Sequence, residues 1–200
     1  MKTRKLVVGI TGASGAMITQ RFLIHAADHF EKIFLMMSAQ AYQVIQTELG
    51  VDMNLNPFST IKWLRKEYPQ IELLDPKNYF SPPASGSFLH DGMVIVPCSM
   101  GTAGRIANGI SDDLMTRSAD VCLKEGRKLI IVPREMPLSC IMLENLTKLA
   151  QAGATILPAC PAWYYRPQTV EDLADSVVAR ILQQLGINQN IFEQWMLNEN

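Results

Sequence analysis

The chain has 200 residues, 48% of them hydrophobic, and its formal net charge is -1 at pH 7. This length indicates a single domain, and the hydrophobic share indicates a well-filled core. The balanced charge gives no electrostatic reason to expect binding to nucleic acid or to an anionic membrane surface. No apolar run approaches the roughly 18 residues that a membrane span needs. The four cysteines are widely spaced, which is typical of a reduced, cytoplasmic protein and not of a disulfide frame or a zinc site.

The first thirty residues predict a strand, a glycine-rich turn and a helix. Residues 5–10 (KLVVGI) form a short apolar run, residues 11–15 (TGASG) follow as the turn, and apolar positions recur at helical spacing over 16–30. This order opens many nucleotide-binding α/β folds. The turn lacks GxGxxG and a Walker lysine, so the dinucleotide and P-loop hypotheses are weak. A mononucleotide site and a tight turn that needs glycine only for its backbone both stay open.

The next stretch predicts a second strand and a less regular middle region. Residues 32–37 (KIFLMM) are apolar and end at Ser38, after which 40–49 have the pattern of a helix. A short strand is expected over 71–74. Residues 75–87 are rich in proline and predict a loop that serves either function or contact between subunits.

The centre of the sequence holds the most informative turn. Met93 to Pro97 form an apolar, β-branched run, as in a strand buried on both faces. Cys98 to Thr102 follow directly as a small polar turn, and a helix is expected from about Ala103. Free amides, hydroxyls and a helix dipole favour an anion at such a turn. Ligands of open α/β sheets bind outside the carboxyl ends of the strands. A capped turn that binds nothing is the alternative.

A second candidate site follows the next strand. The sequence predicts a helix over 112–125, which begins at two aspartates, and a buried strand over 128–132. Arg134 and Glu135 come directly after this strand, between two prolines. Arginine suits phosphate through its planar fork, and a neighbouring carboxylate can transfer protons. The alternative is a surface ion pair of little energetic weight.

The C-terminal part predicts two more helices around a short strand. A helix is expected over 138–152, a strand over 154–157, and a final helix from Thr169 to about residue 185. Residues 158–167 (PACPAWYYRP) form an aromatic loop that either walls a ligand or covers the edge of the core. The tail 188–200 contains Phe192, Trp195 and Met196, and is expected to pack on a neighbouring subunit.

Five buried strands that alternate with helices predict one α/β domain over residues 1–200. We expect a Rossmann-like or flavodoxin-like parallel sheet with helices on both faces and right-handed crossovers. The residues alone therefore indicate a cytoplasmic α/β protein with several phosphate-suited turns at one edge of the sheet.

Six stretches together resemble the UbiX-type flavin prenyltransferases. They are GITGASGA, SGSF, PCSMGT, IANGISDDLMTRSADVCLKE, VPREMPLS and PAWYYRPQTVEDL, in the expected order across nearly the whole chain. The resemblance implies a flavodoxin-like fold and metal-independent transfer of a dimethylallyl unit from dimethylallyl monophosphate to N5 and C6 of reduced FMN. The prenylated FMN would serve a UbiD-type decarboxylase. The family usually forms homo-dodecamers with active sites at subunit junctions.

The resemblance also assigns residues to roles. Glu135 matches the catalytic acid/base, and Glu48 a second active-site glutamate in a looser motif. The remaining matches are residues for FMN, namely Gly12, Ala13, Ser14, Ser38, Ser99, Met100, Gly101, Thr102 and Arg134, and residues for the prenyl phosphate, namely Lys124, Arg134, Tyr164 and Arg180. No metal ligand is expected. The pair Asp112-Asp113 is interpreted as a helix start.

The sequence departs from the common family pattern at three points, none of which removes a proposed reactive group. Gly126 lies in KEGRKL, Trp163 in PAWY and Met136 in REMPL. Two alternatives remain. An FMN-dependent cysteine decarboxylase would typically carry a histidine after the first-helix region and a PxMNxxMW motif, and neither is present. A non-catalytic flavin carrier subunit of a decarboxylase would not need the phosphate-binding and proton-transfer residues.

Overall fold

The computed structural model describes residues 4–52 and 58–192. Within these ranges the chain forms one parallel sheet in the order β3-β2-β1-β4-β5-β6. This confirms the α/β class, and the order is that of Rossmann-type sheets. The strands are β1 (Lys5–Ile10), β2 (Lys32–Met37), β3 (Ile71–Leu73), β4 (Met93–Cys98), β5 (Leu129–Pro133) and β6 (Thr155–Ile156).

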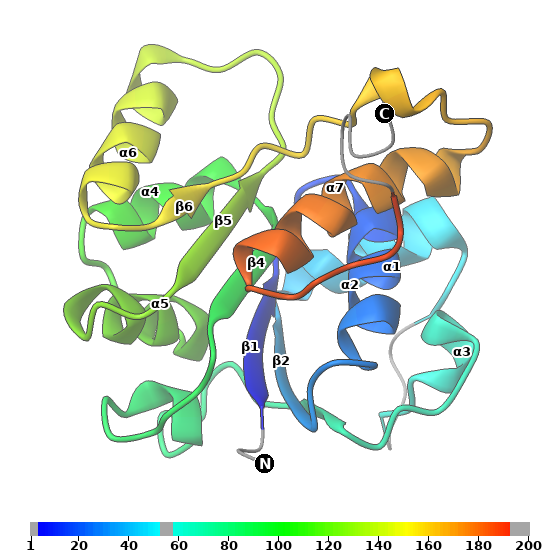
Figure 1. Ribbon diagram of the computed structural model, residues 1–200. Coiled ribbons are helices and arrows are strands. Elements are labelled where there is room, and N and C mark those ends of the chain that lie inside the picture. Colours follow the sequence, from blue (N-terminus) through cyan, green and yellow to red (C-terminus); the bar gives the residue numbers. More distant parts are fainter. Residues whose placement is uncertain (1–3, 53–57, 193–200) are drawn as a thin grey trace.

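Helices cover both faces of the sheet (Figure 1). One face packs against α1 (Ala16–Ala26), α2 (Ala39–Leu49), α3 (Ile61–Leu64) and α7 (Val170–Gln184). The other face packs against α4 (Met100–Ala107), α5 (Leu114–Lys124) and α6 (Cys140–Gln151). Two short 3-10 helices, η1 (Pro82–Ala84) and η2 (Trp163–Tyr165), lie in loops. None of the helices in the described ranges has both the length and the apolarity needed to cross a bilayer.

Two hydrophobic clusters form the core because successive side chains of a strand point to opposite faces. In β1, Leu6 and Val8 join the cluster beneath α1 and α7, whereas Val7 joins the cluster beneath α4 and α5. All three side chains are fully buried. A strand that is buried on both faces reads as a continuous apolar run, which is why the sequence indicated these strands.

A partly buried ion pair joins α1 to α7. The Arg21 guanidinium donates to both carboxylate oxygens of Asp175, at 2.7 and 2.6 Å. Burial raises the pKa of Asp175, but hydrogen bonds from His25 and Arg21 outweigh this effect and lower it. A bidentate pair of this kind fixes orientation as well as distance. It therefore holds α7, which carries Arg180, against the helix that follows the glycine-rich turn.

The first helix and the last strand are shorter than expected. The first helix ends at Ala26, earlier than the expected residue 30. The last strand pairs regularly only over Thr155–Ile156. Pro158 has no N–H to donate, although the amides of Leu157 and Ala159 still bond to β5. In the tail, Phe192 stacks on Tyr165 of its own chain at 4.6 Å. Trp195 and Met196 lie outside the described residues.

Candidate functional site

The candidate site lies at the carboxyl edge of the sheet, between β1 and β4. The chain winds outward in opposite directions from these two strands, so their loops diverge and leave a crevice. Thr11 fastens the two loops together. Its hydroxyl donates to the Pro97 carbonyl at 2.8 Å and accepts from the Ser99 amide at 2.7 Å. The glycine-rich turn and the central polar turn thus form one unit.

A pocket of about 350 Å³ opens at this crevice. Ser38 and Ser99 cap the two helices that point at it, α2 and α4. The amides of Gln40, Met100 and Gly101 carry no intramolecular hydrogen bond among the described residues. Free amides at two helix N-termini favour an anion. The lining residues are Thr11, Gly12, Ser38, Gln40, Ser99, Gly101, Thr102 and Arg105.

Close approach across this pocket explains one glycine of the first turn. A Cβ atom on Gly12 would collide with the Gln40 side chain at the start of α2. Any larger residue would therefore push apart the loops that follow β1 and β2. The predicted FMN residues Gly12, Ser38, Ser99, Gly101 and Thr102 lie together around the pocket. Ala13 is buried in the same turn, and Met100 is the buried first residue of α4.

Arg105 supplies a positive charge beside this pocket. Its NH1 donates to Asp112 at 2.5 Å and to Asp113 at 3.1 Å, and its NH2 donates to the Thr102 hydroxyl at 3.4 Å. Burial lowers the pKa of Arg105, but Asp113 and Asp112 outweigh this effect and raise it, so the charge is permanent. The aspartate pair does start a helix as expected, because Asp113 caps α5.

Glu48 reaches the glycine-rich turn from the far end of α2. Its carboxylate accepts hydrogen bonds from the amides of Gly15, at 3.0 Å, and Ala16, at 2.8 Å. Burial raises the pKa of Glu48, yet hydrogen bonds from Ser14, Ala16 and Gly15 together with the Arg134 charge lower it overall. Glu48 is therefore an ionised carboxylate that occupies the N-terminus of α1.

Arg134 and Glu135 follow β5 and differ in their surroundings. The Arg134 Nε donates to the Ser14 carbonyl at 3.1 Å, which brings this arginine to the glycine-rich turn. Glu135 is exposed, and one carboxylate oxygen accepts from the Met136 amide at 3.1 Å. The structure thus brings Ser14, Glu48 and Arg134 together and leaves Glu135 beside them with its carboxylate open to solvent.

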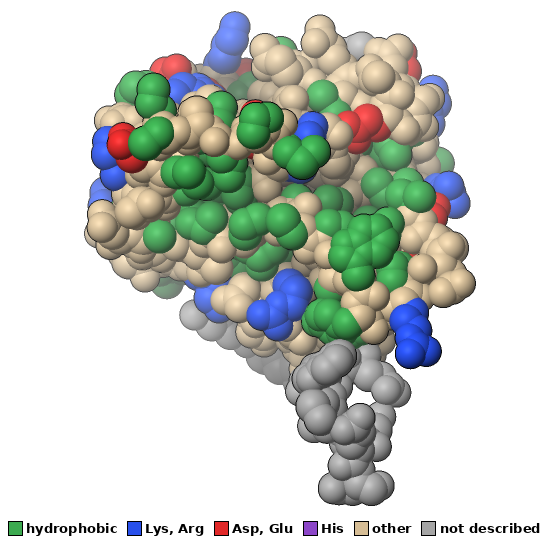
Figure 2. All heavy atoms as spheres, turned by 90° about the horizontal axis from the view of Figure 1, so that it is seen from above, with side chains coloured by type: hydrophobic (Ala, Val, Ile, Leu, Met, Phe, Trp, Pro, Cys, Tyr) green, Lys and Arg blue, Asp and Glu red, His purple; other side chains and the backbone are tan. Residues whose placement is uncertain are grey.

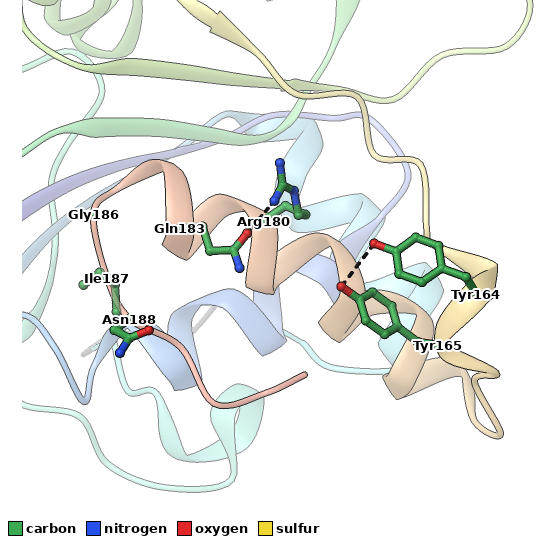
Figure 3. A pocket seen from close by; sticks show the side chains of 7 residues that line it. All are labelled: Tyr164, Tyr165, Arg180, Gln183, Gly186, Ile187 and Asn188. Carbon is green, nitrogen blue, oxygen red and sulfur yellow. Dashed lines mark hydrogen bonds between the residues drawn. The ribbon is translucent and has the colours of Figure 1, made fainter. Parts of the chain in front are cut away.

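A second pocket, of about 530 Å³, lies over α7 and brings Tyr164 and Arg180 together (Figure 3). The Tyr164 hydroxyl donates to the Tyr165 hydroxyl at 3.1 Å, and Arg180 donates to Gln183 at 2.6 Å. Burial and the contact with Tyr164 raise the pKa of Tyr165, so its phenol is neutral at physiological pH. A cation and phenols around an open pocket can hold an anionic group.

Lys124 lies far from both pockets. It is the last residue of α5, next to the Gly86 loop, where it pairs with Glu125. Helix α5 leads back to the start of β5, so Lys124 lies at the amino edge of the sheet (Figure 1). Within one chain it cannot join Tyr164 and Arg180.

Hydrophobic side chains gather over much of the face seen from the carboxyl edge (Figure 2). Among residues in the loops that end there, Met136 is 85% exposed and Trp163 71% exposed. A large exposed apolar area marks an interaction surface. Across residues 4–52 and 58–192, no group of three His, Cys, Asp or Glu side chains is placed to hold a metal ion.

Sequence reasoning missed three residues of the site. Thr11 was assigned only to a turn, Gln40 only to a helix, and Arg105 to no role. Arg105 lies three residues after Thr102, one helical turn away and on the same face of α4. That spacing from the polar turn was a signal in the sequence that could have identified it.

Known proteins resemble this chain over nearly its full length. A sequence-family profile described as Flavoprotein matches residues 1–182. A protein named flavin prenyltransferase UbiX from Alkalihalophilus pseudofirmus is 44% identical over 191 residues, covering 95% of each chain. The protein of the same name from Methanocaldococcus jannaschii is also 44% identical over 191 residues, covering 96% of this chain and 98% of its own.

Solved structures also resemble this chain over nearly its full length. AnUbiX (PadA1), in complex with FMN and dimethylallyl pyrophosphate, has a TM-score of 0.86 at 38% identity, covering 97% of this chain and 98% of its own. A dodecameric FMN-dependent UbiX-like decarboxylase from Escherichia coli O157:H7 has a TM-score of 0.83 at 40% identity, covering 96% of this chain and 98% of its own. The peptidyl-cysteine decarboxylase EpiD, at 21% identity and a TM-score of 0.55, shares the fold alone. The chain therefore belongs to the UbiX flavin prenyltransferase family of flavoproteins.

Proposed function

We propose that this protein is a flavin prenyltransferase, which joins the dimethylallyl unit of dimethylallyl monophosphate to N5 and C6 of reduced FMN. The observation that carries the proposal is the presence of two separate anion-suited pockets, one between α2 and α4 and one over α7. FMN has a single phosphate, so the second pocket fits a second phosphate-bearing substrate. Two findings support this function. The relatives of this chain are named flavin prenyltransferase UbiX, and AnUbiX was solved in complex with FMN and dimethylallyl pyrophosphate.

The first pocket fits the phosphate end of FMN. Its walls offer free amides and hydroxyls to an anion, and Gly12 leaves room that a side chain would fill. Reduced FMN would supply the nucleophilic nitrogen of the reaction. The residues that we assign to holding it are Gly12, Ala13, Ser14, Ser38, Ser99, Met100, Gly101, Thr102 and Arg134.

The second pocket fits the phosphate of the prenyl donor. Tyr164 and Arg180 would hold this phosphate and stabilise the negative charge that grows on it as the carbon–oxygen bond breaks. We assign Arg134 and Lys124 to the same group. Because Lys124 lies at the amino edge, it can reach a donor phosphate only on a neighbouring copy of the chain.

Two glutamates have different proposed roles. Glu135 is exposed beside Arg134, and its side chain accepts only from the Met136 amide among the described residues, so it is free to take the proton that leaves C6. Glu48 already accepts from two amides of the first turn, so we propose that it positions this turn. Direct proton transfer by Glu48 stays a prediction.

Assembly, partner and location belong to the same proposal. We propose a homo-oligomer, as in the dodecameric neighbour, in which copies cover the exposed apolar side chains and shield the donor site from water. The product would pass to a UbiD-type decarboxylase. The four cysteines are free, which is consistent with the proposed cytoplasmic location.

An anaerobic assay tests the function. The purified protein is mixed with reduced FMN and dimethylallyl monophosphate, and the molecular mass of the extracted flavin is measured by mass spectrometry. We expect a flavin heavier by one prenyl unit in the wild type and little of it in Arg180→Ala, with Lys62→Ala, an exposed lysine on α3, as the control. Unmodified flavin with the monophosphate, the diphosphate and longer donors alike would refute the proposal.

Decarboxylation is the second candidate, because two similar structures bear that name. They are the E. coli protein and a phenylacrylic acid decarboxylase from Aquifex aeolicus at 34% identity. The same preparation is incubated with phenylacrylic acid and FMN but without a prenyl donor. Release of CO2 under these conditions would favour this second activity.

A further inference from the structure

We propose that Arg105 is the cation that recognises the phosphate of the flavin, and that Asp112 and Asp113 hold it in position. The inference deepens the proposed function and rests only on the part of it that concerns FMN binding. It concerns the pocket between α2 and α4, where neither the sequence nor the family resemblance assigned a role to this arginine.

Of the described residues that line this pocket, Arg105 alone is charged. The other lining groups among the described residues are glycines, hydroxyls and the Gln40 amide. Arg134, the arginine expected to bind FMN, does not line this pocket. Its guanidinium contacts the Ser14 carbonyl, and its charge helps to lower the pKa of Glu48. A phosphate in the pocket therefore faces Arg105 and not Arg134.

The hydrogen bonds around Arg105 leave donors available to the pocket. Its NH1 is committed to the two aspartates, while its Nε has no partner among the described residues. Thr102 Oγ1 accepts from Ser99 at 3.1 Å as well as from Arg105 at 3.4 Å, so the Thr102 hydroxyl proton is left to donate. Arginine and hydroxyl donors of this kind suit phosphate oxygens.

The two aspartates make the arginine rigid. Asp113 caps α5 through a capping box with Thr116, and the Ile110 amide bonds to the Arg105 carbonyl at 2.9 Å. Arg105 is thus held at the junction of α4 and α5 before any ligand arrives. A pre-positioned guanidinium loses less conformational entropy on binding than a free one.

A purely structural role is the competing explanation, in which Arg105 only fastens the loop 108–113 to α4. The two roles differ in their dependence on the flavin phosphate. Riboflavin has the same ring and ribityl chain as FMN without the phosphate. Recognition of the phosphate affects FMN alone, whereas a structural role affects both flavins.

The experiment compares FMN and riboflavin titrations of the full-length protein, followed by flavin fluorescence. For Arg105→Ala we expect FMN affinity to fall by about ten- to a hundredfold, the range for one hydrogen bond to a charged group, with riboflavin affinity unchanged. The matched control is Arg117→Ala, since Arg117 has the same exposure and pairs with Asp120 on α5, outside the pocket. Circular dichroism checks the fold of each variant.

If Arg105→Ala does not fold, Arg105→Gln is titrated in its place, and inorganic phosphate is tested on the wild type as a competitor of FMN and of riboflavin. Competition with FMN alone supports a phosphate site. Unchanged FMN affinity in the variant, or an equal loss for both flavins, overturns the role of Arg105. A variant that loses FMN affinity while the wild type makes no prenylated flavin would refute the proposed function and leave this inference standing.

Discussion

Replacing Thr11 by valine tests whether one hydroxyl joins the two loops of the site. Valine has nearly the same shape, and Thr11 is only 2% exposed, so the change removes hydrogen bonds without leaving a large cavity. The bond to the Pro97 carbonyl is lost, at a cost of about 1 kcal/mol. Pro97 keeps its bond from the Thr11 amide, but the Ser99 amide loses its acceptor, which costs about 1–3 kcal/mol more.

The free energy of unfolding is therefore expected to fall by about 2–4 kcal/mol in total, measured by urea denaturation. Thr19→Val is the matched control. Thr19 is also fully buried and donates one bond of 2.8 Å to a β4 carbonyl, that of Val96, but accepts none from a loop amide. The Thr19→Val variant should lose only about 1 kcal/mol of unfolding free energy and keep the FMN affinity of the wild type. We call the two hydrogen bonds of the Thr11 hydroxyl, to Pro97 and from Ser99, the clamp at Thr11. If Thr11→Val lowers the free energy of unfolding no more than Thr19→Val does, and if both variants bind FMN equally well, the clamp does not join the two loops.

Three further predictions concern the glutamates and the shared site. Glu48→Gln should lower stability at pH 7 by about 1 kcal/mol, as for a lost helix N-cap. Because the folded pKa of Glu48 lies below its ordinary value of 4.5, its contribution is present above that pH and is lost as the pH falls through the lowered pKa. Melting curves of wild type and variant should therefore converge in acid, and a gap that is constant down to pH 3 would contradict the capping role. Glu135→Gln should bind FMN normally and slow prenyl transfer by about 10²- to 10⁴-fold in the anaerobic assay, and undiminished turnover would exclude it as the acid/base. Lys124→Ala and Arg180→Ala should each be inactive alone, whereas co-expression should restore about a quarter of the activity if each site takes one residue from each of two copies. If verified mixed oligomers recover no activity, the expectation is wrong. Either one chain supplies both residues to a site, or Lys124 lies outside the site.

The arrangement of the site shows which residues sequence reasoning could place. Ser38 and Ser99 follow apolar runs directly, and parallel strands bring their carboxyl ends to one edge, so their meeting was predictable. Glu48 was assigned from a loose motif, but its contact with Gly15 spans 33 positions and depends on how α2 lies against α1. The spacing of Arg105 from Thr102 places both on one face of α4. That the pocket lies at this face depends on loops that are distant in the sequence.

By itself, the sequence determined the α/β class and the glycine and hydroxyl turns, because apolar periodicity and turn chemistry are local properties of the chain. The family came from the resemblance of six stretches to the UbiX-type flavin prenyltransferases. It left the Rossmann-like and flavodoxin-like arrangements open. Only the tertiary structure decided the strand order, the clamp at Thr11, the separation of Lys124 from Arg180 and the position of Arg105. These features depend on which side of the sheet each crossover takes and on how helices pack against each other, and such long-range contacts have no signature in neighbouring residues.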